Sequence, residues 1–154
     1  MYEIIRYLHA LAMIGAVSAA IVPPALLLAV TRRGDVGAMR GFASLAVSLR
    51  SLAAPLIVLA ALLGFVAAII GRVDPLRPWL IAAYAAFAIA LLTGALLSDP
   101  WARRVGDAAG ASPANAPSRE LRSAIDDRRG ALATAILAIS VAIIIFMGVN
   151  RPGG

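Results

Sequence analysis

Four stretches of this chain contain no charged residue, and each is long enough to cross a membrane as a helix. They hold 25, 21, 21 and 21 residues and cover positions 7–31, 51–71, 78–98 and 130–150. At about 1.5 Å per residue, 21 helical residues reach about 31 Å, the thickness of the hydrocarbon core of a bilayer. All 22 charged side chains lie between or outside these stretches. The sequence therefore predicts an all-α membrane protein, a bundle of four transmembrane helices.

Composition leaves no room for a separate soluble domain. Apolar residues make up 62% of the chain, charged residues 14%, and the mean hydropathy is +0.91; soluble domains have about 45–50% and 25%. We therefore expect one membrane domain over residues 1–154. The absence of cysteine excludes disulfides, thiolate metal sites and cysteine nucleophiles.

The basic residues are fourteen arginines and no lysine, and alanine and glycine are abundant, as in proteins from GC-rich bacterial genomes. This composition favours a bacterial cytoplasmic (inner) membrane. The net charge of +6 does not indicate a nucleic-acid partner, because in a membrane protein arginines gather at the cytoplasmic face. The bilayer itself is the partner that the sequence predicts most directly.

The arginines are divided unequally between the two sides of the predicted bundle. The N-terminus, the second connection and the C-terminus carry Arg6, Arg72, Arg77 and Arg151. The first and third connections carry ten, namely Arg32, Arg33, Arg40, Arg50, Arg103, Arg104, Arg119, Arg122, Arg128 and Arg129. Because the arginine-rich side is normally cytoplasmic, we expect both termini outside, an N-out/C-out topology.

Prolines interrupt the first stretch. Pro23 and Pro24 lie well inside it, where a proline removes a backbone donor and crowds the preceding turn. We expect a kink that fits a neighbouring helix; the alternative is a broken helix that exposes carbonyl groups to a substrate. Pro55 and Pro78 are expected in first turns, where proline is tolerated.

Small residues recur four apart in the other three stretches, which would let helix backbones approach closely in lipid. We expect these ridges to pack the interior of the bundle; the alternative is that one of them, on the third stretch, docks against a neighbouring protein. The predicted helix-packing residues are Ala60, Gly64, Ala68, Ala86, Ala90, Gly94, Ser98, Gly130 and Ala138, and the last ridge also includes Thr134 and Ala142.

Aromatic residues flank two of the stretches. Tryptophan and tyrosine are enriched at membrane interfaces, where they fix the depth of a helix. The residues placed as such anchors are Tyr2, Tyr7, Trp79 and Trp101.

The two longer connections differ in character. Residues 35–51 alternate apolar and polar positions at helical spacing, which predicts a short amphipathic helix that lies in the interface or prolongs the second span. Residues 106–118 are small, polar and proline-containing, which predicts a flexible loop. Ser118 is placed to cap a helix over 119–129, with Asp126 spaced to pair with Arg122 and Arg129.

His9 is the one ionisable side chain within the charge-free stretches that suggests chemistry. It lies about one turn inside the first stretch. A neutral imidazole can ligate a haem iron, a metal or a pigment magnesium, so His9 is a candidate cofactor-binding residue. The alternative is a structural histidine satisfied by Glu3, Arg6 or Tyr7 on its own helix.

Catalytic groups are missing from the stretches. No pair of carboxylates lies within them, and their serines and threonines have no base nearby in sequence except His9. We therefore expect neither an enzyme nor catalytic residues, and no metal site.

The segment Tyr7-Leu8-His9-Ala10-Leu11, followed by Gly15, precedes a basic connection, and Pro78-Trp79 opens the third stretch. In these features the chain resembles a family of uncharacterised small four-helix bacterial membrane proteins, distantly akin to the copper-resistance D family. The resemblance implies four helices with a histidine early in the first, and no particular activity. Copper-resistance D proteins have further histidine and methionine ligands, which this chain lacks.

Ridges and interfacial anchors are plentiful while catalytic groups are missing. We therefore expect a non-enzymatic accessory or assembly subunit of a larger membrane complex, with other integral membrane subunits as partners. Two alternatives stay open. One is a haem-, pigment- or metal-binding protein that uses His9 as a ligand, and the other is a small-solute carrier, suggested by Pro23-Pro24.

Overall fold

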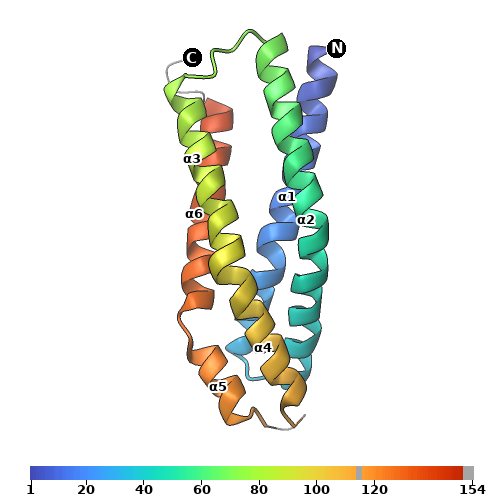
Figure 1. The fold of residues 1–154 in the computed structure, drawn as a ribbon, viewed down its shortest axis with the longest axis vertical. Coiled ribbons are helices and arrows are strands. Elements are labelled where there is room, and N and C mark those ends of the chain that lie inside the picture. The colour runs from blue at the N-terminus through green and yellow to red at the C-terminus, as the bar shows by residue number, and fades with distance from the viewer. Residues whose placement is uncertain (114–115, 151–154) are drawn as a thin grey trace.

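The computed structural model describes residues 1–113 and 116–150, and these form a bundle of antiparallel helices (Figure 1). Four helical segments are long and apolar enough to cross a membrane, as predicted. In chain order the elements are α1 (Tyr2–Thr31), α2 (Val36–Ile70), α3 (Pro78–Thr93), the π-helical turn η1 (Gly94–Ser98), α4 (Asp99–Ala111), α5 (Arg119–Asp126) and α6 (Arg129–Asn150).

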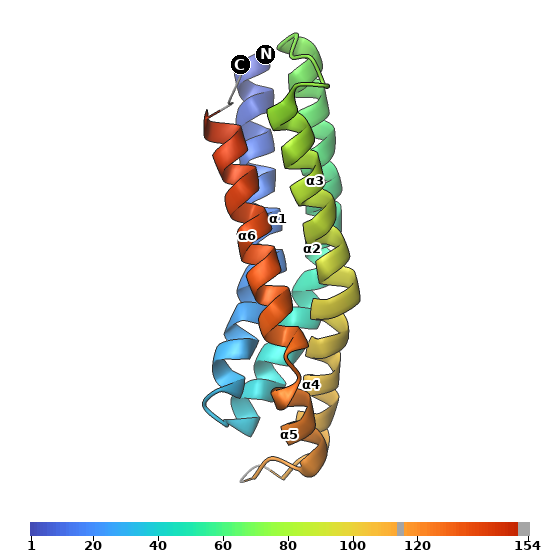
Figure 2. The same ribbon diagram turned by 90° about the vertical axis from the view of Figure 1, so that its left-hand side faces the viewer.

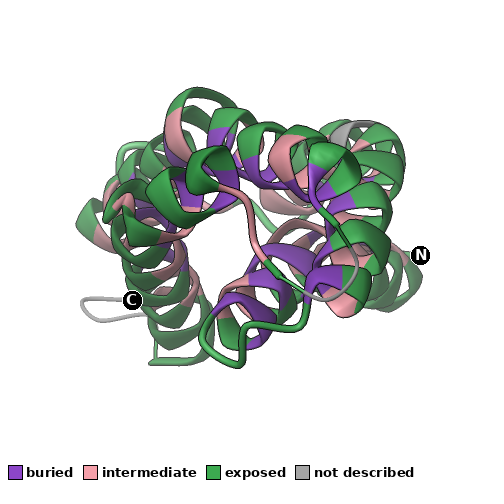
Figure 3. Cartoon of the chain, turned by 90° about the horizontal axis from the view of Figure 1, so that it is seen from below, coloured by how far each residue is buried: buried purple, intermediate pink, exposed green. Residues whose placement is uncertain are grey.

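The start of α1 and the end of α6 lie at the same end of the bundle, together with the α2–α3 connection (Figures 1 and 2). We call this the terminal end. The α1–α2 connection, α4 and α5 lie at the opposite end, the loop end. Viewed along the bundle, the buried residues face inward and the exposed ones outward (Figure 3).

The amphipathic segment predicted over 35–51 prolongs the second span, because α2 runs without a break for 35 residues. Asp35 caps its start by accepting a hydrogen bond from the Ala38 backbone N–H at 2.9 Å. This early start corrects the expectation for Pro55, which lies in the interior of α2 and not in a first turn. Pro78 opens α3, as predicted.

α1 also continues through its two prolines. Pro23 and Pro24 are both buried inside a single helix of 30 residues. The alternative of a broken first helix is therefore wrong. The small-solute carrier that Pro23 and Pro24 suggested stays a prediction.

The loop end has its own apolar core. Trp101 is only 2% exposed, and its Nε1–H donates to the Ala124 carbonyl at 3.2 Å. The expectation that Trp101 is an interfacial anchor is therefore wrong, because α5 and the start of α6 cover its ring. The buried members of this core are Leu27, Val30, Val36, Met39, Ala43, Trp101, Ala102, Val105, Ala109, Leu121 and Ala124.

The flexible loop predicted over 106–118 is shorter than expected, because α4 continues to Ala111. Arg40 of α2 stabilises the end of α4: its Nε donates to the Ala109 carbonyl at 2.7 Å and its Nη2 to the Ser112 carbonyl. A cation is favoured at a helix C-terminus, where carbonyl groups lack partners. Positions 114–115 of the predicted loop lie outside the described residues.

Ser118 caps α5 as predicted, accepting from the Leu121 N–H at 3.2 Å. The helix expected over 119–129 ends at Asp126, and α6 begins at Arg129. In the described part of the chain, the ion pairs of this segment involve Asp127 in place of Asp126. Oδ2 of Asp127 lies 3.0 Å from Nη1 of Arg104 and 3.9 Å from Nε of Arg129.

Candidate functional site

The ridge on α2 contacts α1 through His9. Ala60 is fully buried, Gly64 lies directly under the His9 ring, and Ala68 is half-buried. A Cβ at Gly64 would lie 2.8 Å from Cε1 of His9, so glycine is needed for this approach. α1 and α2 pack closely along this contact, as the ridge predicts.

His9 hydrogen-bonds to the neighbouring helix and not to its own. Its Nδ1 lies 2.8 Å from the Ala60 carbonyl oxygen. Because a carbonyl only accepts, Nδ1 donates this hydrogen bond, and the neutral form of the ring then has its lone pair on Nε2. Two of the predicted same-helix partners, Glu3 and Arg6, form an ion pair with each other. Nη2 of Arg6 lies 2.8 Å from Oε2 of Glu3.

The ridge on the third span faces the interior. Ala86, Gly94 and Ser98 are buried and Ala90 is half-buried. This arrangement fits the predicted packing role within the bundle, and it leaves no free ridge on this face of α3 for a neighbouring protein.

The ridge on α6 is only partly inside. Gly130 is buried under the Trp101 ring, where a Cβ would collide with the ring. Ala138 is exposed, which corrects the expectation that it packs the bundle. The reason is the rotation of α6, whose buried face runs through Gly130, Ala133, Leu137 and Ser140. The exposed face contains the small residues Ala131, Ala135, Ala138 and Ala142.

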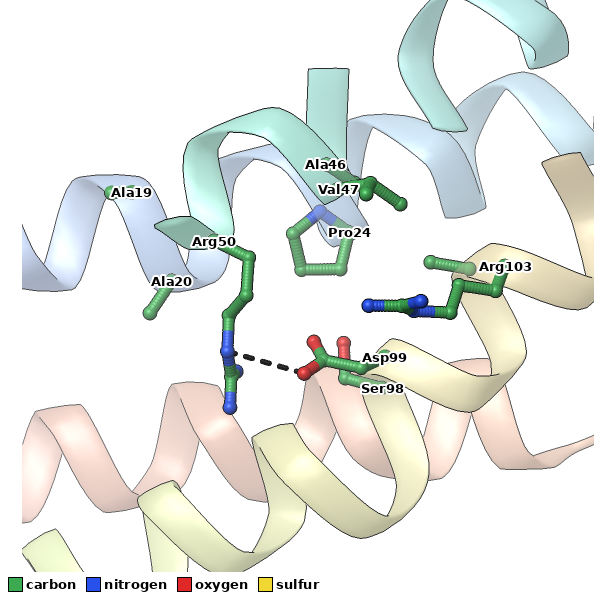
Figure 4. A pocket seen from close by; sticks show the side chains of 10 residues that line it. Ala19, Ala20, Pro24, Ala46, Val47, Arg50, Ser98, Asp99 and Arg103 are labelled. Atoms are coloured by element: carbon green, nitrogen blue, oxygen red, sulfur yellow. Dashed lines mark ion pairs between the residues drawn. The ribbon is translucent and has the colours of Figure 1, made fainter. Parts of the chain in front are cut away.

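An ion pair that the sequence analysis missed joins the second and third spans. Nε of Arg50 in α2 lies 3.1 Å from Oδ2 of Asp99 at the start of α4 (Figure 4). Each residue lies one position outside a charge-free stretch, 51–71 and 78–98. These two boundaries meet at the same depth because the spans are antiparallel, and this signal in the sequence could have revealed the pair.

The ion pair adjoins a small cavity, which Pro24, Ala46 and Ser98 help to line. Its empty space of about 390 Å³ includes the part open to the outside. Arg103, one turn after Asp99 on α4, lines the same cavity and reaches toward the carboxylate (Figure 4). Two guanidinium groups thus lie beside one carboxylate. The cluster carries a net positive charge.

The π-helical turn η1 brings Gly94 against Arg50. Nη1 of Arg50 would lie 2.7 Å from a Cβ at Gly94. Single π turns inside α-helices are frequent at functional sites. Here the turn ends directly before Asp99, so it adjoins both partners of the ion pair.

A second cavity, with about 540 Å³ of empty space including the part open to the outside, lies between α1, α2, α3 and α6 on the terminal side of this pair. Its lining is apolar except for Arg50, and it includes Ala16, Phe87, Ala90 and Leu137. Arg50 and Ala20 line both cavities. The guanidinium therefore lies between an apolar space in the membrane half of the bundle and a charged one toward the loop end.

Within residues 1–113 and 116–150, no group of three or more His, Asp or Glu side chains is close enough to hold a metal ion. The geometry offers two sites of possible chemistry, the His9 ring and the Arg50 cluster (Arg50, Asp99 and Arg103).

No family model, curated protein or solved structure matches this chain. The resemblance to small four-helix bacterial membrane proteins and to the copper-resistance D family therefore stays a prediction.

Proposed function

We propose that this protein is a non-enzymatic accessory or assembly subunit of a larger membrane complex and that it docks through the exposed face of α6. The observation that carries this proposal is the stripe formed by Ala131, Ala135, Ala138 and Ala142, all of them exposed. Their spacing of three and four residues places them on one side of the helix.

Small residues on a lipid-facing surface allow the backbone of another helix to approach closely. In lipid there is no hydrophobic force between helices, so association depends on close backbone approach and on van der Waals packing. The opposite face of α6 already packs inside the bundle. The exposed stripe therefore supports docking by a transmembrane helix of another subunit.

Substitution of the stripe tests this proposal. Ala138→Leu with Ala142→Leu should release the partner from protein purified in mild detergent, as measured by native mass spectrometry. Ala88→Leu, at an exposed alanine of α3, is the matched control and should retain the partner. Retention of the partner by the α6 variant contradicts the proposal, and so does a complex that contains this chain alone.

A second candidate function uses His9 as a ligand for a haem, pigment or metal. The hydrogen bond from Nδ1 to the Ala60 carbonyl supports it, because ligating histidines usually fix their tautomer through the other ring nitrogen. Nε2 would then be the ligating atom. A visible absorption band that disappears in His9→Ala would support a haem or pigment, and a bound metal that elemental analysis finds in the wild type but not in His9→Ala would support a metal. A purified protein with neither would contradict this function.

We further propose that the loop end faces the cytoplasm of a bacterial cell and that both termini lie outside its inner membrane. The ten arginines of the two longer connections support this orientation. A reporter fused after Gly154 should be active outside the cytoplasm, and one inserted after Pro113 should be active inside. The reverse pattern contradicts the proposal.

A further inference from the structure

We propose that the apolar cavity and Arg50 bind a single-chain amphiphile with an anionic head, namely a long-chain carboxylate. The tail would occupy the space between α1, α2, α3 and α6, and the head would bind the Arg50 guanidinium. This site is separate from the exposed face of α6 on which the proposed function rests.

The cavity has the apolar lining of a small-molecule site. Its empty space of about 540 Å³ includes the part that is open to the outside of the bundle. It extends from Phe87 to Gly94 along the third span and from Leu137 to Ile144 along α6. Seven residues of helix correspond to about 10 Å, which suits a stretch of one acyl chain.

The charge at the cavity selects the head group. Arg50 is the one charged residue in the cavity lining. It uses Nε toward Asp99, whereas Nη1 lies over Gly94, which itself lines the cavity. Within the described residues, no protein acceptor forms a hydrogen bond with the Nη atoms of Arg50. The edge of the guanidinium away from Asp99 can thus bind a carboxylate through two parallel hydrogen bonds.

The surroundings hold this guanidinium in place. Asp99 fixes the Nε side of Arg50, and the missing side chain at Gly94 gives room to its Nη1 side. Arg103 lies near Asp99 and offsets its negative charge (Figure 4). An anionic head at Arg50 therefore meets a cluster of net positive charge, and Asp99 does not have to be displaced.

Binding of palmitate to the purified full-length protein tests the proposal, with native mass spectrometry in a nonionic detergent as the readout. Palmitate should bind one molecule per chain. Hexadecanol has the same chain length and no charge and should bind at least about tenfold more weakly, since a hydrogen bond to a charged group contributes more than a neutral one.

Two variants separate the head site from the tail site. Arg50→Gln should weaken palmitate binding at least about tenfold. The matched control Arg104→Gln, at a guanidinium of α4 that pairs with Asp127 and lines neither cavity, should change it less than about twofold. Ala90→Phe leaves Arg50 intact but fills the cavity, and it should abolish binding. Ala138→Leu with Ala142→Leu should not affect palmitate binding. A negative result for this cavity would therefore leave the proposed docking face of α6 untouched, and the reverse holds as well.

Three results would overturn the proposal. One is equal binding of palmitate and hexadecanol, which would show that no anion is recognised. Another is unchanged palmitate binding by either Arg50→Gln or Ala90→Phe, which would place the ligand elsewhere on the protein. The third is tighter binding of a two-chain phosphatidylglycerol than of palmitate, which would identify a lipid contact on the outer surface.

Discussion

Nε of Arg50 and Oδ2 of Asp99 lie 3.1 Å apart and link α2 to α4 at the loop-end boundary of the charge-free stretches. The two side chains are 32% and 30% exposed, so the pair is only partly accessible to water. Its energy should therefore lie between that of a surface pair and that of a fully buried one.

Arg50→Gln and Asp99→Asn should each lower the free energy of unfolding by about 1–2 kcal/mol, because each leaves the opposite charge without its main partner. The double variant should lose less than the sum of the two, since it leaves no isolated charge. Reversible unfolding in mixed detergent and SDS micelles measures the three values. Strict additivity would show that the pair does not stabilise the fold.

Gly130 and Gly148 provide a matched test of packing along α6. A Cβ at Gly130 would collide with the Trp101 ring, so Gly130→Ala should lower the free energy of unfolding by about 1–3 kcal/mol. Gly148 has no atom within 4 Å of the corresponding Cβ position, so Gly148→Ala should be neutral or slightly stabilising. Equal effects on the unfolding midpoint in SDS would contradict this account of the loop-end core.

Gly94 should respond to the size of its substituent. The group nearest to a Cβ at Gly94 is the flexible end of Arg50, which can move, so Gly94→Ala should be mild. Gly94→Leu should be much less stable, because a branched side chain must displace the Arg50 guanidinium and enter the cavity that Gly94 lines. Thermal unfolding in detergent compares the two variants. Wild-type stability in Gly94→Leu would mean that this position faces lipid.

His9 and Gly64 should be energetically coupled. His9→Ala should lower the free energy of unfolding by about 1 kcal/mol, the typical contribution of one hydrogen bond. Gly64→Ala should cost a similar amount by pushing the ring away from the Ala60 carbonyl, but it should cost little once the ring is removed. Unfolding of the single and double variants measures the coupling. An undiminished cost of Gly64→Ala without the ring would contradict the geometry.

The four spans were predictable because the absence of charge over 21 or more residues depends only on bilayer thickness. The extensions beyond the spans were harder to predict. Residues 106–111 are small and glycine-containing, which indicates a loop, yet α4 continues through them because Arg40 and the core around Trp101 hold its last turn. Such tertiary contacts override local propensity.

The candidate sites, too, are predictable from the sequence only in part, because their contacts depend on how the helices pack. The close approach at Gly64 follows from the spacing of small residues, but its partner, the His9 ring, depends on how α1 and α2 are aligned. The exposure of Ala138 depends on how α6 is rotated about its own axis. Spacing alone does not predict this rotation, because small residues lie on both faces of the helix, with Ala133 buried and Ala138 exposed. Arg50 was assigned to a connection because it lies just outside its charge-free stretch.

Cross-linking from the exposed face of α6 tests the proposed docking role most directly. The chain has no cysteine, so Ala138→Cys introduces a single site for a photoreactive maleimide in native membranes. Ala88→Cys on the exposed side of α3 is the control. We predict that illumination joins the Ala138→Cys variant, and not the control, to a different membrane protein identified by mass spectrometry. If the Ala138→Cys variant gives no protein adduct, or only a dimer of this chain, the account of α6 as the face that docks onto a larger complex is wrong.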